Sequence, residues 1–293
     1  MTLRLTKHHG LGNDFLVLLD LDGRQRLDAD LARALCDRHR GIGADGLIRG
    51  SVPGVADQGA ALAFELYNAD GSGAEMSGNG VRCLAQAALD AGLVAAGQPF
   101  SVLTPAGSKT VVVRPTDRPA TVWASVEMGM ARVAGEADRC NVGHGQLLVD
   151  LGNPHLVVLG PDPATVAVGE LGPALAATAP ETNGINVEFV ALGPGPDEIT
   201  MRVWERGVGE TLACGTGACA AAVAMRHWGR TGRKVTVHQP GGPAEVELRP
   251  DGTVVLSGPS VRIGAVEVDL SGFPGPPPGR GSLEPAEQEG VAR

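Results

Sequence analysis

The stretch CGTGACAAAVAM (Cys214–Met225) has a counterpart 137 residues earlier, SGNGVRCLAQAA (Ser77–Ala88). In each stretch a serine or cysteine precedes Gly-x-Gly, and a run rich in alanine follows. Alanine favours helix, and the glycines suit a tight turn where the helix begins. Each stretch therefore predicts a helix whose first turn presents unpaired backbone N–H groups beside a hydroxyl or a thiol.

Two further boxes repeat in the same order along the chain. LGNDFLVL (Leu11–Leu18) matches LGNPHLVV (Leu151–Val158), and GIGADGLI (Gly41–Ile48) matches GINVEFV (Gly184–Val190). These two pairs are offset by 140 and 143 residues, close to the 137 of the first pair. Three boxes in one order at nearly constant spacing indicate an internal duplication.

The segments around these boxes predict strands, because most are β-branched or alternate between apolar and polar residues. We therefore expect an α/β (α+β) protein with two pseudo-symmetric lobes. Each lobe would wrap strands around a central helix, and the cleft between the lobes is the expected active site. The expected helices cover residues 30–38, 80–91 and 217–227.

The duplication also predicts the domain boundaries. The N-terminal lobe is expected to comprise residues 1–120 together with a strand that returns at about 262–270. The C-terminal lobe is expected to comprise residues 121–261. Residues 271–293 are rich in proline and glycine and lack apolar periodicity, which predicts a disordered tail.

The composition excludes several classes of function. A net charge of −9 argues against nucleic-acid binding. The chain has no apolar run long enough for a membrane span and no signal-peptide core, so we expect a cytoplasmic protein. Five scattered cysteines indicate reduced thiols rather than a disulfide framework. No metal-binding spacing, pyridoxal lysine motif or complete nucleotide fingerprint is found, so we expect neither a metal nor a cofactor.

If the two lobes face each other, their two helix starts converge. The backbone N–H groups there could then hold a carboxylate, with Ser77 and Cys214 on opposite sides of it. A helix start is also expected to lower the pKa of the Cys214 thiol. This geometry suits inversion of a stereocentre α to a carboxylate, because one group removes a proton and the other delivers one to the opposite face. The N–H groups are those of Gly78, Asn79, Gly215 and Thr216.

The motifs resemble those of the diaminopimelate epimerase family, which makes precursors of lysine and peptidoglycan without a cofactor. The resemblance extends from about His9 to Ile263. It implies interconversion of LL- and meso-diaminopimelate, a small amino-acid substrate, two opposing catalytic thiols and a homodimer. It rests on HGLGNDF, DRHRGIGADG, YNADGSGAEMSGNGVRC, LGNPH, GINVEFV and WERGVGETLACGTGACA.

The resemblance also implies roles for individual residues. Cys214 matches the family's second catalytic cysteine. Glu205 and Arg206 match a pair that recognises the distal ammonium and carboxylate of the substrate, and His155 and Glu205 match positions that tune the pKa of the thiols. The implied substrate-binding residues are Asn13, Asn68, Asn153 and Asn186, with the N–H groups of Gly78, Asn79, Gly215 and Thr216.

The chain departs from the family at two positions. Ser77 stands where the family has its first catalytic cysteine, and Cys83, six residues later, faces another side of the helix. A serine hydroxyl ionises far above a thiol's pKa of about 8.5, so Ser77 suits proton donation unless a neighbour such as His155 activates it. Gly46 stands where some members carry a glutamine that contacts substrate, a role that a backbone group can fill.

Three functions are therefore compatible with the sequence. The first is diaminopimelate epimerase acting through Ser77 and Cys214. The second is an epimerase, racemase or dehydratase for another amino acid, which depends on whether Glu205 and Arg206 face the distal end of the cleft. The third is a binding protein on the same fold, which would not exchange the α-hydrogen of its ligand.

Overall fold

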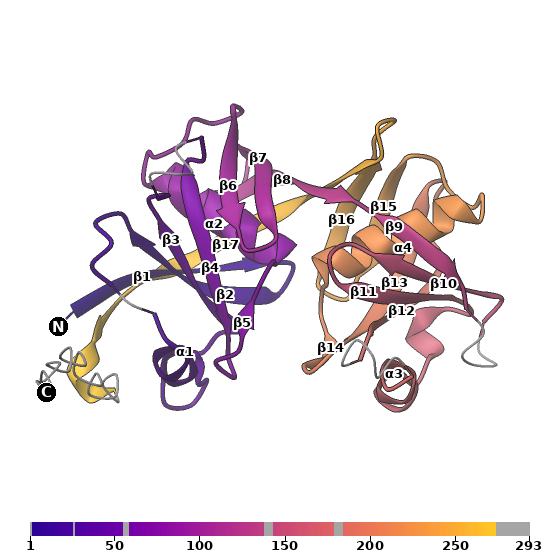
Figure 1. Ribbon diagram of the computed structural model, residues 1–293, viewed down its shortest axis with the longest axis horizontal. Coiled ribbons are helices and arrows are strands. Elements are labelled where there is room, and N and C mark those ends of the chain that lie inside the picture. Colours follow the sequence, from indigo (N-terminus) through magenta and orange to yellow (C-terminus); the bar gives the residue numbers. More distant parts are fainter. Residues whose placement is uncertain (1, 26, 55–58, 138–142, 179–183, 274–293) are drawn as a thin grey trace, which may run out of the picture.

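Strands dominate the computed structural model, which describes residues 2–25, 27–54, 59–137, 143–178 and 184–273. Figure 1 shows them gathered around two helices, α2 in the left half of the molecule and α4 in the right half. The first strand group is β1 (Thr2–Gly10), β2 (Asn13–Asp20), β3 (Gly46–Ser51), β4 (Leu62–Asn68), β5 (Gly73–Ala74), β6 (Pro99–Thr104), β7 (Gly107–Pro115) and β8 (Thr121–Met130). The second strand group is β9 (Arg132–Glu136), β10 (Gly145–Asp150), β11 (Pro154–Leu159), β12 (Asn186–Leu192), β13 (Glu198–Glu205), β14 (Gly209–Thr211), β15 (Lys234–Gln239), β16 (Gly242–Leu248) and β17 (Thr253–Asp269). The helices are α1 (Ala29–Cys36), α2 (Gly78–Asp90), α3 (Val168–Ala176) and α4 (Gly215–His227), with 3₁₀ turns at η2 (Pro163–Thr165) and η4 (Leu270–Gly272).

The strand pairings follow the same order in the two groups. In the first, β1 and β2 are antiparallel, β2 and β3 parallel, and β3 and β4 antiparallel. In the second, β10 and β11 are antiparallel, β11 and β12 parallel, and β12 and β13 antiparallel. The parallel pairs β4–β6 and β13–β15 continue the correspondence. The α/β class is confirmed, and the repeated pairing agrees with the duplicated boxes.

Two segments join the strand groups to each other. β8, which the sequence assigned to the C-terminal lobe, pairs with β7 on one edge and with β17 on the other. The chain then continues into β9, which pairs with β10 of the second group. β17 pairs first with β16 and, from Val261 onward, with β1. β17 therefore closes the first group by bridging β8 and β1, and β8 leads directly into β9 of the second group.

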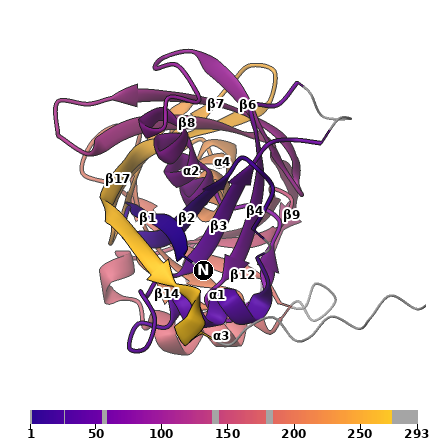
Figure 2. The ribbon, with the colours of Figure 1, turned by 90° about the vertical axis from the view of Figure 1, so that its left-hand side faces the viewer.

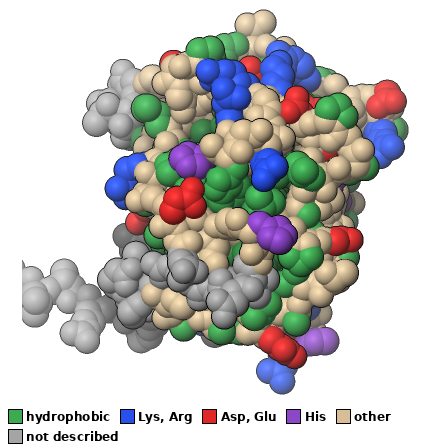
Figure 3. Space-filling model, turned by 90° about the vertical axis from the view of Figure 1, so that its right-hand side faces the viewer, with side chains coloured by type: hydrophobic (Ala, Val, Ile, Leu, Met, Phe, Trp, Pro, Cys, Tyr) green, Lys and Arg blue, Asp and Glu red, His purple; other side chains and the backbone are tan. Residues whose placement is uncertain are grey.

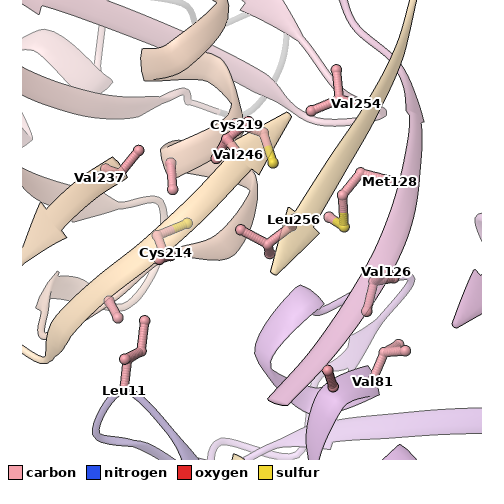
Figure 4. Packing of buried hydrophobic residues seen from close by; sticks show 14 of the residues in the cluster. Leu11, Val81, Val126, Met128, Cys214, Cys219, Val237, Val246, Val254 and Leu256 are labelled. Atoms are coloured by element: carbon pink, nitrogen blue, oxygen red, sulfur yellow. The ribbon is translucent and has the colours of Figure 1, made fainter. Parts of the chain in front are cut away.

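Helices α2 and α4 occupy the interior of their strand groups. Every residue from Gly78 to Ala88 is buried, so α2 is covered on all sides, and most of α4 is buried in the same way. Figure 2, along the long axis of the molecule, shows α2 inside the ring of strands with α4 behind it. In Figure 4, Leu256 of β17 lies with Cys214 and Cys219 on one side and Met128 on the other. A single apolar core therefore supports both helix starts.

The helices show where sequence patterns were sufficient and where they were not. α2 and α4 begin two residues before the predicted positions, because their caps are Ser77 and Cys214 themselves. α3 was not predicted. Of the predicted tail, Ser271 and Gly272 belong to the η4 turn, and residues 274–293 lie outside the described residues. No helix among the described residues is long and apolar enough to cross a membrane.

The surface carries charges of both signs. On the face shown in Figure 3, the described acidic and basic side chains lie scattered rather than gathered in one stripe. The chain as a whole has 24 lysines and arginines against 33 aspartates and glutamates. On this face the described residues form no basic stripe of the kind that phosphate backbones require.

Candidate active site

One cleft, with a volume of about 480 Å³, brings residues of both strand groups together. Twelve of the thirteen predicted site residues line it, and the exception is His155, which is fully buried behind the cleft wall. The twelve are Asn13, Asn68, Ser77, Gly78, Asn79, Asn153, Asn186, Glu205, Arg206, Cys214, Gly215 and Thr216.

The starts of α2 and α4 meet at this cleft. Ser77 caps α2 through Oγ, which accepts a hydrogen bond from the Gly80 N–H at 3.0 Å. Cys214 caps α4 in the same way, with its Sγ accepting from the Gly217 N–H at 3.3 Å. Both side chains therefore stand at helix N-termini, where the backbone carries a partial positive charge.

Two glycines allow the helix starts to approach each other. A Cβ atom on Gly215 would lie 3.4 Å from the Gly78 Cα and 2.8 Å from Leu256 Cδ2. A Cβ atom on Gly78 would lie 2.7 Å from the same Leu256 methyl group. A larger residue at either position would press on Leu256, so the two glycines let both helix starts pack against the same leucine side chain.

The electrostatics of Cys214 contradict the expectation from the helix start. Burial raises the pKa of its thiol well above the usual range, and the carboxylates of Glu205 and Glu188 raise it further. Hydrogen bonds to Thr216 and Gly217 act in the opposite direction, but they are the smaller effect. A helix start does favour a thiolate, but here two acidic side chains in a buried site outweigh it. In the free protein the thiol is therefore protonated.

Glu205 lies beside this thiol. Burial raises the pKa of the Glu205 carboxyl, whereas hydrogen bonds from Thr211 and Cys214 lower it. Arg206, the next residue, is exposed on the cleft wall, and its backbone N–H donates to Asn186 Oδ1 at 2.8 Å. The two members of the predicted pair therefore stand in different surroundings, one against the thiol and the other toward solvent.

The cleft asparagines are each held by a neighbour. Asn13 donates from Nδ2 to Asp45 at 2.8 Å, and Asn79 donates to Asn13 Oδ1 at 3.1 Å. Asn68 donates to the Ser72 hydroxyl at 3.0 Å. Such bonds fix which end of each amide faces the cleft, and so fix where donors and acceptors are offered to a ligand.

His155 does not activate Ser77. Its Nδ1 lies 2.7 Å from Glu188 Oε1, and its Nε2 lies 3.1 Å from Asn153 Oδ1. Both ring nitrogens are therefore engaged on the Cys214 side of the cleft. Cys83 is no substitute for Ser77 either, because it is fully buried in the core and burial raises its pKa to about 12.

Three residues escaped the sequence analysis although each belongs to a quoted motif. Asp45 lines the cleft and holds Asn13. Glu188 is buried beside His155. Arg82 is buried beneath Asn79 and donates to Asn79 Oδ1 at 2.7 Å. A charged residue within a mostly apolar predicted strand or helix is the signal that could have found Glu188 and Arg82, because such residues are rarely buried without a partner.

At Gly46, the second departure from the resembled family, the surroundings leave no room for a side chain. A Cβ atom there would lie 2.9 Å from the Tyr67 carbonyl oxygen and 3.0 Å from Leu66 Cδ1. A glutamine at this position would require the strands to move. Gly46 itself is not among the cleft-lining residues, whereas its neighbour Asp45 is.

Known proteins resemble this chain over most of its length. The sequence model of the family described as "Diaminopimelate epimerase" matches residues 5–134 and 147–263. A diaminopimelate epimerase of Synechococcus elongatus is 39% identical, covering 92% of this chain and 100% of that protein. One from Desulfitobacterium hafniense is 38% identical, covering 89% of this chain and 96% of that protein.

Solved structures show the same fold at low sequence identity. A predicted epimerase from Pseudomonas aeruginosa superposes with a TM-score of 0.69 at 16% identity, covering 91% of this chain and 99% of that one. A hydroxyproline epimerase from Agrobacterium vitis gives 0.66 at 18% identity, covering 93% and 94%. Because the family model matches most of the chain and close relatives span nearly its full length, this protein belongs to the diaminopimelate epimerase family.

Proposed function

We propose that this protein interconverts LL- and meso-diaminopimelate by moving the α-proton between two opposed groups, Cys214 and Ser77. The observation that carries the proposal is the meeting of two capped helix starts across Gly78 and Gly215. A carboxylate held by the N–H groups there would place its α-carbon between the thiol and the hydroxyl. In one direction the Cys214 thiolate would take the α-proton and the Ser77 hydroxyl would give its own proton to the opposite face. In the reverse direction the two groups exchange these roles.

The raised pKa of Cys214 makes proton removal depend on the bound substrate. A protonated thiol cannot act as a base, so the proton must leave Sγ before the reaction. Glu205 accepts a hydrogen bond from the Cys214 thiol and is itself disposed to hold a proton, since burial raises its pKa. We assign Glu205 to take the thiol proton, which leaves a thiolate facing the α-carbon. Arg206, at the exposed part of the cleft wall, is assigned to the distal carboxylate.

The two strand groups are inferred to be pseudo-symmetric lobes, with the cleft between them and the boundary in the β8–β9 segment. The repeated pairing order supports this inference. Family membership supports a cytoplasmic homodimer that needs no cofactor. Light scattering during size-exclusion chromatography tests the dimer directly.

Exchange of the α-hydrogen in D₂O tests the activity. The protein is incubated with LL-diaminopimelate, and NMR follows both α-deuteration and the appearance of the meso isomer. We expect both in the wild type and neither in Cys214→Ala. Lysine serves as the control substrate, because it lacks the distal carboxylate. Equal exchange of lysine would favour an epimerase for other amino acids, whereas binding of diaminopimelate without any exchange would identify a binding protein.

A further inference from the structure

Glu188 of β12 is a fully buried acid for which the sequence suggested no role. Its Oε1 atom lies 2.7 Å from Nδ1 of His155, which is also fully buried. Its Oε2 atom has no hydrogen-bond partner among the described residues. A Cβ atom on Gly217 would lie 2.7 Å from Glu188 Oε1, so the carboxyl packs directly against the first turn of α4. Burying a carboxyl group with one unpaired oxygen costs free energy, so we expect Glu188 to have a function.

The corresponding place in the first strand group is apolar. The strand registers put Phe15 and Ile48 where the second group has His155 and Glu188. A Cβ atom on Gly80 would lie 3.1 Å from Ile48 Cδ1, just as one on Gly217 would meet Glu188. The polar pair therefore supports only the half of the cleft that carries Cys214, and the half that carries Ser77 is supported by hydrocarbon.

A chain of polar contacts leads from this pair into the cleft. His155 Nε2 lies 3.1 Å from Asn153 Oδ1, and Asn153 Nδ2 donates to Thr216 Oγ1 at 3.4 Å. Thr216 Oγ1 is in turn 3.5 Å from Cys214 Sγ. An amide oxygen only accepts, so His155 Nε2 donates to Asn153 Oδ1, while Nδ1 faces Glu188 Oε1.

We propose that Glu188 is a positioning residue that acts through His155 to fix the orientation of the Asn153 amide. The inference rests on the function proposed above. Without Glu188, His155 is free to place its hydrogen on Nδ1, and a bare Nε2 attracts the nitrogen of the Asn153 amide instead of its oxygen. The amide then turns over and offers Thr216 and the substrate an acceptor in place of a donor. Substrate binding weakens, while the groups that move the proton stay in place.

Glu188→Met removes the carboxyl at nearly constant length. We expect KM for diaminopimelate to rise about tenfold, the effect of losing one well-placed buried hydrogen bond, with a smaller change in kcat. Glu188→Gln should recover most of the loss, because its amide N–H can donate to His155 Nδ1 and keep the hydrogen on Nε2. Adding Asn153→Ala to Glu188→Met should raise KM little beyond Asn153→Ala alone, because both act on one contact.

The control is Glu198→Met, which breaks a second His–Glu pair, with His238, at the same 2.7 Å separation away from the cleft. If Glu188→Met does not fold, the double variant His155→Phe with Glu188→Ile takes its place. It copies the apolar pair of the first strand group, removes both members of the buried pair together, and should show the same rise in KM.

Three results would overturn the role of Glu188. They are an unchanged KM in Glu188→Met, a Glu188→Gln variant as impaired as Glu188→Met, and losses that simply add in the Asn153→Ala double variant. Absence of exchange in the wild type would instead contradict the proposed function.

Discussion

Gly215→Ala tests whether the approach of the two helix starts sets the catalytic geometry. The new methyl group would lie 2.8 Å from Leu256 Cδ2 and 3.4 Å from the Gly78 Cα. Leu256 is fully buried and cannot swing into solvent. An overpacked core of this kind costs about 1–3 kcal/mol. Replacing glycine by alanine within a helix returns roughly 0.5–1 kcal/mol, so we expect a net destabilisation of at most about 2.5 kcal/mol.

The effect on activity should be much larger than the effect on stability. Relief of the clash with Leu256 requires the start of α4 to shift, which changes the position of Cys214 relative to Ser77. A displacement on the order of 1 Å at the reacting groups can lower a rate by about 100-fold. We therefore expect Gly215→Ala to melt only a few degrees below the wild type, at about 2–4 °C per kcal/mol, while kcat for α-deuteration falls by about two orders of magnitude.

Leu256→Val supplies the matched rescue. It removes the obstructing methyl group at a cost of about 1 kcal/mol when introduced alone. In the double variant with Gly215→Ala the stability losses should be less than additive. Gly264→Ala on β17 is the control, because a Cβ atom there meets nothing within 4 Å. Wild-type activity in Gly215→Ala, or strictly additive losses in the double variant, would refute the assigned packing role of these glycines.

The remaining predictions concern pH and substrate length. Burial raises the pKa values of Cys83 and Cys219 to about 12 in the folded protein. The folded state therefore holds these thiol protons more tightly than the unfolded state, and their contribution to stability is lost as pH rises above the ordinary thiol pKa of about 8.5. Above this pKa, the free energy of unfolding measured with urea should fall by up to about 1.4 kcal/mol per pH unit for each thiol. Cys83→Ala should make this dependence on pH less steep. Arg206→Lys should raise KM for diaminopimelate steeply, because lysine lacks the planar guanidinium that matches a carboxylate. Exchange of lysine as substrate should be unchanged. A normal KM for diaminopimelate would show that Arg206 does not bind the distal carboxylate.

Short-range patterns in the sequence were enough to locate the two helix starts. A cap residue, Gly-x-Gly and a run of alanines determine Ser77–Ala88 and Cys214–Met225 locally, and the duplication relates one to the other. α3 escaped because Pro173 and two glycines stand inside it, and these residues disfavour a helix unless tertiary contacts hold it.

The electrostatics of the site depend on contacts between residues far apart in the chain. His155 and Glu188 are 33 residues apart and meet only because β11 and β12 are parallel. The pKa of Cys214 was expected to fall because only the helix start was visible in the sequence. Burial is the main cause of its rise, and the carboxylates that raise it further come from β12 and β13, which the sheet register brings close to the thiol.

The roles of Ser77 and Cys214 on opposite faces of the α-carbon are tested most directly by Ser77→Ala in D₂O, with each isomer of diaminopimelate supplied separately. The variant keeps the Cys214 base and loses the opposing donor. It should deuterate the isomer whose α-hydrogen faces Cys214, with retention of configuration, and produce little of the other isomer. Cys214→Ala should do neither. Interconversion of the two isomers by Ser77→Ala at the wild-type rate, with deuterium in the product, would contradict these roles.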